Sequence, residues 1–267
     1  MARFRRMVLP LAALCLAVGH AAAQDTLATQ LGNLMSLRDK VGDADTRVRV
    51  DALHRVWRIA LNSPHSDVKV TAIDLLKEPL GSASDHIRMP AAYAIAEIAN
   101  STDDQNVKLR ALTALNEPLN ASQVPIRDVA IDVANSITRS ARAGDLALAA
   151  VTALGPPVRS GNNGVRIPAI NALVRAVEGS QSEAAYRAAL DLLVAPLDSG
   201  SLIGGLEVRM MALLAVEHIG LDASDVATKA KAVGLAQSYA SRGGWEPEAN
   251  RRAQEAAAAI QASIKPR

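Results

Sequence analysis

Histidine, cysteine and carboxylate side chains are the groups that could bind a metal or catalyse a reaction, and their spacing decides whether they can act together. After the first two dozen residues the chain holds four histidines: His54, His65, His86 and His218. No two of them are three or four residues apart, the spacing that places two metal ligands on one helix face, and the single cysteine is Cys15. The sequence has no Gly-x-Ser-x-Gly nucleophile motif and no glycine-rich phosphate loop. It therefore predicts no catalytic residue, no metal site and no cofactor.

The remaining titratable residues have simpler explanations than catalysis. Asp128 and Asp132 are four residues apart and share a helix face, where a solvated surface accounts for the pair. His54 and His218 are expected on the polar face of a helix or as hydrogen-bonded core residues. These interpretations favour a protein that binds rather than one that catalyses.

Aromatic residues make up 2% of the chain, and two of them occupy candidate binding positions. Trp57 and Tyr93 lie in segments that we expect to form helices of consecutive repeats, with Arg58 and Glu97 close by in the sequence. Aromatic and arginine side chains dominate the energetics of protein interfaces. We predict that these four residues contact a protein or peptide partner.

A period of 39 residues defines the elements that position these side chains. Four prolines follow it, each after a similar apolar segment: Pro79, Pro118, Pro157 and Pro196. Five arginines repeat at the same interval, the last after 43 residues: Arg49, Arg88, Arg127, Arg166 and Arg209. Proline is expected to close a helix in each period, because it lacks the backbone N–H and clashes with the preceding turn.

Each period contains two apolar patterns with spacings of three and four residues, which place their members on one face of a helix. One pattern is Val68, Ala72, Ile73, Leu76 and Leu80, and the other is Val48, Ala52, Leu53, Val56 and Ile59. No segment alternates with a period of two, so we expect no β-sheet. A helix pair that cannot bury its apolar face alone must stack on its neighbours, which predicts an all-α solenoid.

The segment Asp85-His86-Ile87-Arg88-Met89-Pro90-Ala91 resembles the start of the second helix in HEAT repeats. The resemblance covers almost the whole chain and implies about six helix pairs. Their expected ranges are 27–61, 66–100, 105–140, 144–178, 183–220 and 223–264. It also implies that the second helices line a concave face. The arginine column would then be a structural ladder that bonds backbone or acidic groups of the adjacent repeat.

The first 23 residues have the pattern of a secretory signal peptide. Three arginines precede an uncharged apolar run from Met7 to Val18, and Ala21-Ala22-Ala23 forms a cleavage site. Cleavage would leave a chain that begins at Gln24, lacks cysteine and occupies the periplasm or the exterior. A lipid anchor on Cys15 and twin-arginine export through Arg5-Arg6 are the alternatives.

Loss of this segment removes three arginines and no acid, which changes the net charge from +2 to −1. The near-neutral charge and the scarcity of aromatics argue against nucleic acid as a partner. No later segment is apolar enough for membrane insertion. The sequence thus predicts an exported scaffold, formed by residues 24–267, that binds a protein or peptide without catalysis. An enzyme or cofactor-binding protein of the HEAT-like class, for example one like the phycobilin lyases, is the alternative, and a structural assembly element is a third possibility.

Overall fold

The computed structural model describes residues 27–139, 144–198, 205–241 and 246–264. The signal peptide expected over residues 1–23, together with Cys15 and the expected new terminus Gln24, lies outside these ranges. All regular secondary structure within the described ranges is helical, which confirms the predicted all-α class. Among these helices none is both long and apolar enough to cross a membrane.

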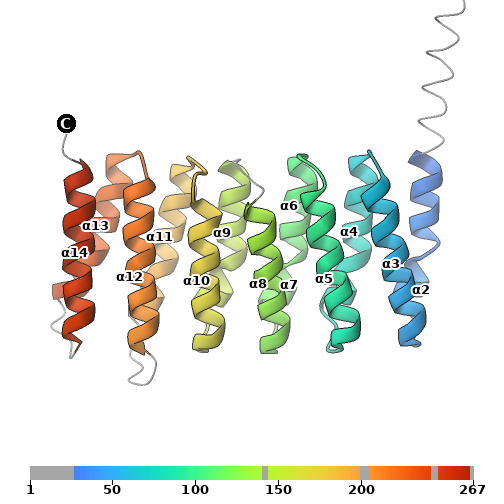
Figure 1. The fold of residues 1–267 in the computed structure, drawn as a ribbon, viewed down its shortest axis with the longest axis horizontal. Coiled ribbons are helices and arrows are strands. Elements are labelled where there is room, and N and C mark those ends of the chain that lie inside the picture. Colours follow the sequence, from blue (N-terminus) through green and yellow to red (C-terminus); the bar gives the residue numbers. More distant parts are fainter. Residues whose placement is uncertain (1–26, 140–143, 199–204, 242–245, 265–267) are drawn as a thin grey trace, which may run out of the picture.

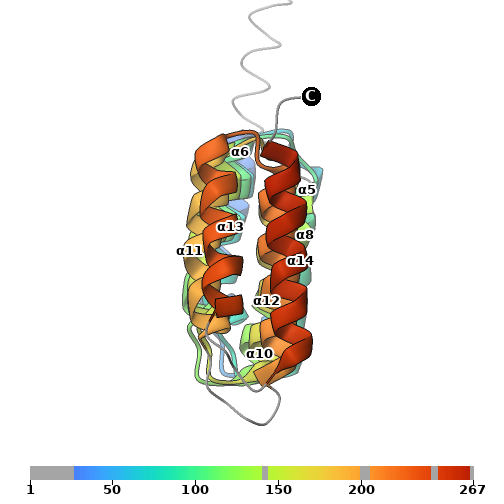
Figure 2. The same ribbon diagram turned by 90° about the vertical axis from the view of Figure 1, so that its left-hand side faces the viewer.

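The helices stand in two layers, one formed by the first helix of each pair and the other by the second (Figures 1 and 2). The first layer, called layer A, contains residues 27–35, α2 (Arg38–Val41), α4 (Ser66–Leu80), α6 (Gln105–Ala114), α7 (Asn116–Leu119), α9 (Gly144–Val158), α11 (Glu183–Leu197) and α13 (Val226–Ser241). The second, called layer B, contains α3 (Thr46–Asn62), α5 (Asp85–Asn100), α8 (Val124–Arg139), α10 (Asn163–Val177), α12 (Gly205–Asp222) and α14 (Pro247–Ile264). This succession of helix pairs is the predicted solenoid.

Local sequence signals determine where the helices begin and end. Asp45, Asp104 and Asn162 each precede a helix and accept a hydrogen bond from a backbone N–H in its first turn. Each repeated proline is the penultimate residue of its layer-A helix, so these helices end one residue beyond the proline. In the third pair the layer-A helix is interrupted at Leu115, whereas the helices that contain the other three repeated prolines are continuous.

Two columns of buried alanines allow neighbouring helices to approach closely. Layer A carries Ala72, Ala111, Ala150, Ala189 and Ala232, and layer B carries Ala52, Ala91, Ala130, Ala169 and Ala212, each at most 1% exposed. The same small residue thus lies at the helix contacts of both layers. The array of helix pairs is nearly straight (Figures 1 and 2). The expected concave face is therefore a nearly flat face of layer B.

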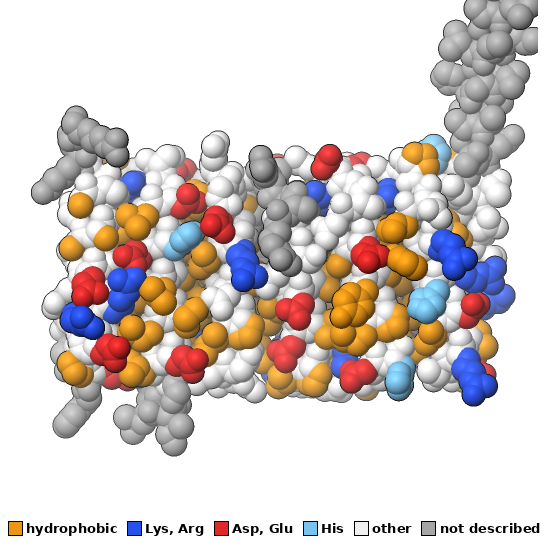
Figure 3. All heavy atoms as spheres, viewed as in Figure 1, with side chains coloured by type: hydrophobic (Ala, Val, Ile, Leu, Met, Phe, Trp, Pro, Cys, Tyr) orange, Lys and Arg blue, Asp and Glu red, His pale blue; other side chains and the backbone are white. Residues whose placement is uncertain are grey.

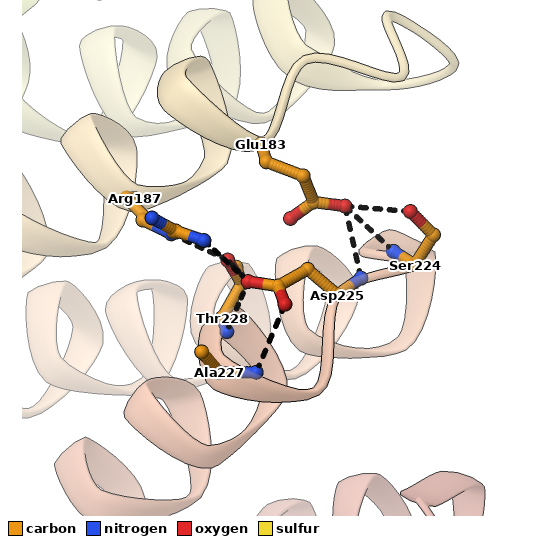
Figure 4. A network of polar contacts seen from close by, with 6 residues as sticks. All are labelled: Glu183, Arg187, Ser224, Asp225, Ala227 and Thr228. Carbon is orange, nitrogen blue, oxygen red and sulfur yellow. Dashed lines mark hydrogen bonds and ion pairs between the residues drawn. The ribbon is translucent and has the colours of Figure 1, made fainter.

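A polar network joins the last two layer-A helices, α11 and α13 (Figure 4). Oε1 of Glu183 accepts hydrogen bonds from the backbone N–H groups of Ser224 and Asp225, both at 3.0 Å. Asp225 accepts from the backbone N–H of Thr228 at 3.1 Å and from the guanidinium of Arg187. Glu183 and Arg187 of one repeat thus satisfy the start of a helix in the next repeat, which fixes the alignment of the two repeats.

The repeated arginines do not share one kind of partner. Nε of Arg49 donates to the carbonyl oxygen of Val41 at 3.2 Å. Nη1 of Arg88 donates to the carbonyl oxygens of Ser82 and Ala83, at 2.9 and 3.4 Å. Both arginines therefore bond the turn within their own repeat, whereas the resemblance implied the adjacent repeat. The reason is that each side chain lies at the start of its helix, beside the turn that leads into it.

The later arginines differ again. Arg209 bonds Glu246 of the next repeat, with Nε donating to Oε2 at 2.7 Å, as the resemblance implied. Nε of Arg127 and Nε of Arg166 are buried without a hydrogen-bond partner in the structure. Burial also lowers the pKa of the Arg166 guanidinium. The column is thus regular in sequence but not in its contacts.

Candidate protein interface

A depression of about 350 Å³ lies on layer B between α3 and α5. We call it the α3–α5 depression, and it is lined by Leu53, His54, Trp57, Met89, Pro90, Tyr93, Ala94 and Glu97. Three of the four predicted binding residues, Trp57, Tyr93 and Glu97, are thus brought together. Figure 3 shows hydrophobic side chains exposed along the layer-B face, on the side of α3 and α5 as well as over the later repeats.

The two aromatic side chains are presented differently. Tyr93 is 64% exposed, which is unusual for a large apolar side chain, while Trp57 is partly buried against the core. Both lie on the outer side of their helices because the neighbouring positions Val56 and Ala92 occupy the buried stripe. The Tyr93 ring and the uncovered part of the Trp57 ring therefore form an accessible apolar surface.

Glu97 is connected to the depression by a hydrogen bond between repeats. The indole Nε1–H of Trp57 donates to Oε2 of Glu97 at 2.8 Å. The bond orients the indole ring and places a carboxylate at the wall of an apolar depression. Because this bond occupies the indole N–H, Trp57 offers a partner only the faces of its ring.

The fourth predicted residue, Arg58, is exposed and does not line the depression. Glu97 is its counterpart one period later, and Glu97 reaches back to the preceding layer-B helix. No described helix of layer B precedes α3, so Arg58 has no corresponding helix to contact. Arg58 therefore lies outside the depression that brings the other three residues together.

Residues that the sequence analysis did not select complete the depression. Met89 and Pro90 form its wall on α5 and, with His54, also line an adjoining groove of about 780 Å³. Pro90 lies inside α5 and cannot donate a hydrogen bond to the carbonyl of His86. The sequence offered no distinguishing signal for this wall, because Ile167 and Pro168 occupy the equivalent positions in α10, two periods later.

Further depressions lie elsewhere on the array. A depression of about 540 Å³ lies between α10 and α12 on layer B. Leu214 and Leu221, which line it, are 41% and 45% exposed. At its edge Nε2 of His218 lies 3.8 Å from Oε1 of Glu178. A third, of about 370 Å³, lies on layer A between α6 and α9. Neither contains a tryptophan or a tyrosine, so the α3–α5 depression is chemically distinct.

Asp128 and Asp132 of α8, the two carboxylates with helical spacing, belong to layer B. Burial and the neighbouring carboxylate of Asp132 raise the pKa of Asp128, and Arg127 partly opposes them. Within the described part of the chain, no group of three or more histidine, cysteine, aspartate or glutamate side chains is arranged to hold a metal ion. His54 and His218 are both exposed, which agrees with their expected place on polar helix faces.

Comparison with known proteins identifies the fold. No protein-family model and no curated protein sequence matches the chain. A designed armadillo repeat protein in complex with the peptide (KR)4 superposes with a TM-score of 0.50 and 21% identity, over 87% of this chain and 99% of its own. A HEAT-like repeats protein from the archaeon Thermococcus onnurineus NA1 gives a TM-score of 0.48 and 16% identity, over 91% of this chain and 94% of its own.

These likenesses concern the fold, since the sequence identities are low. The two stacked helical layers and the superposition on the designed armadillo repeat protein define the class of fold: an all-α repeat solenoid. The predicted all-α solenoid of stacked helix pairs is thereby confirmed.

Proposed function

We propose that this protein is a non-enzymatic scaffold that binds a segment of another protein at the α3–α5 depression. The observation that carries the proposal is the pair of aromatic side chains that line that depression, exposed Tyr93 and partly buried Trp57, in a chain where aromatics make up 2%. Exposed aromatic side chains in a depression are typical anchors of protein interfaces. The fold supports the proposal, because solenoids present long surfaces made of successive repeats.

Site-specific photo-crosslinking in cells of the source organism tests this function. A photoreactive benzoylphenylalanine replaces His54, which lines the depression while Trp57 and Tyr93 stay intact. We expect an adduct of defined mass, and we expect Tyr93→Ala in the same protein to reduce its yield at least fivefold. The control places benzoylphenylalanine at Val226, which is exposed like His54 but lies on layer A. Equal yields at the two positions, or no adduct at His54, would contradict the proposal.

We also propose that the protein acts outside the cytoplasm after removal of residues 1–23. The support is the arginine-led apolar run with its small-residue cleavage site. Intact-mass measurement of the protein recovered from the periplasm or medium should give a chain that begins at Gln24. A mass that includes Met1, or a lipid on Cys15, would show that the leader is not processed in this way.

A further inference from the structure

We infer that the α3–α5 depression binds an arginine side chain of the partner, with the guanidinium on the rings of Trp57 and Tyr93 and against the carboxylate of Glu97. The inference rests on the proposed function and specifies the chemistry of the partner. Three features of the depression lead to it: its charge, the way Trp57 is bonded, and the kind of surface that the two aromatic residues present.

The charge of the depression favours a cation. Glu97 is the single carboxylate among the residues that line it, and no lysine or arginine of the described chain does so. Arg55 of α3 is not among these lining residues and forms an ion pair with Asp51 at 4.0 Å. The bond from the indole of Trp57 leaves the negative charge of Glu97 in place, because an indole N–H is a neutral donor. A cation in the depression would therefore find a carboxylate without displacing a basic group of this chain.

The bonding of Trp57 disfavours recognition of a partner's backbone. An indole N–H can bond a backbone carbonyl, but here it already donates to Glu97 at 2.8 Å. Trp57 and Glu97 therefore offer a partner the face of the indole ring and a carboxylate, and the Tyr93 ring lies on the adjacent helix. The polar atoms that remain are the Tyr93 hydroxyl and the His54 imidazole, both at the edge of an otherwise apolar lining.

Arginine fits this combination better than lysine. Its planar guanidinium stacks on aromatic rings and donates hydrogen bonds to a carboxylate at the same time, whereas the ammonium of lysine is more strongly hydrated. Its three-carbon stem can pack on apolar atoms such as those of Met89 and Pro90. The depression thus presents both a stacking surface and an acceptor for one side chain.

The test uses the full protein and a blocked tripeptide, acetyl-Ala-Arg-Ala-amide. The matched probe replaces arginine by citrulline, which has nearly the same shape but no charge. Binding is followed by the NMR signal of the Trp57 indole N–H, assigned from its loss in Trp57→Phe. We expect the arginine peptide to shift this signal and to bind at least tenfold more tightly than the citrulline peptide. Equal binding of the two peptides, or no shift at 50 mM peptide, would overturn the inference.

Variants separate the contributions of the carboxylate and of the aromatic ring to binding. Glu97→Gln keeps an acceptor for the indole but removes the charge, and should lower the affinity for the arginine peptide at least tenfold. Tyr93→Phe should change this affinity less than twofold, whereas Tyr93→Leu should lower it at least threefold. Glu207→Gln, which removes an exposed carboxylate from α12, is the control and should have no effect. If Glu97→Gln binds as tightly as the unmodified protein, the inference is wrong; an undiminished His54 adduct in that variant would show that the proposed function still holds.

Discussion

Gly220 of α12 and Ile260 of α14 lie so close that a Cβ atom added at Gly220 would come within 2.7 Å of Cδ1 of Ile260. The same Cβ would come within 2.9 Å of the Cβ of Ala232 on α13. Glycine therefore allows α12 to approach both helices of the last repeat, so that the final pair packs tightly against the array.

We predict that Gly220→Ala destabilises the protein. Overpacking of a core commonly costs about 1–3 kcal/mol, which exceeds the helix-propensity gain of about 1 kcal/mol expected from alanine. Gly234→Ala on α13 is the control, because a Cβ there meets no atom within 4 Å. The control should stabilise the protein by about 0.5–1 kcal/mol. Urea unfolding of both variants measures the difference, and a stable Gly220→Ala protein would show that the helices can move apart at little cost.

The hydrogen bond between Trp57 and Glu97 should couple two repeats energetically. A double-mutant cycle with Trp57→Phe and Glu97→Ala is expected to give a coupling energy of about 0.5–1 kcal/mol. The value is small because Glu97 is exposed. Chemical unfolding of the four proteins gives the coupling energy. A value indistinguishable from zero would mean that the bond does not hold the indole in solution.

The arginine column should show unequal contributions to stability. Arg88 is 3% exposed and bonds two carbonyl oxygens of its turn, so Arg88→Ala should lower the free energy of unfolding by about 1–3 kcal/mol. Arg127→Ala should cost less. Nε is buried without a partner in both arginines, but the guanidinium of Arg127 makes no hydrogen bond to a carbonyl oxygen of the described residues. Thermal unfolding of the two variants provides the comparison. A larger loss for Arg127→Ala would indicate that this arginine acquires partners in solution.

The network around Asp225 makes the contact between α11 and α13 sensitive to acid. Its hydrogen bond with Arg187 and those with backbone N–H groups lower the pKa of Asp225 from 3.8 to about 2. A carboxyl group whose pKa is lowered by folding stabilises the native state above its unfolded pKa. This stabilisation should be complete above about pH 4 and should decrease as the pH falls from there towards 2.

Hydrogen exchange of the α13 backbone amides between pH 2 and pH 5 tests this behaviour, after correction for the intrinsic exchange rates. The decrease in protection on acidification should be smaller in Asp225→Asn than in the unmodified protein, because asparagine does not titrate. Asp51→Asn is a suitable control, since Asp51 is exposed on α3 and far from this network along the array. Identical pH profiles for the unmodified protein and Asp225→Asn would contradict the assignment.

The sequence by itself determined the class of fold and the positions of most helices. The 39-residue period, the apolar spacings of three and four, and the prolines near helix ends act over a single helix or turn, so they can be recognised along the chain. The buried alanine columns follow from the same local periodicity, because a residue on the apolar stripe of a stacked helix must face the core.

The tertiary structure alone decided which side chains meet between repeats. Trp57 bonds Glu97, which is 40 residues away, one more than the period, so comparison of equivalent positions pairs Glu97 with Arg58 instead. The partners of the arginines and the nearly flat face of layer B were likewise not evident from the sequence. The physical reason is that such contacts depend on the shift and rotation of one helix against the next. Those quantities result from the packing of many core side chains at once, which periodicity along one chain does not specify.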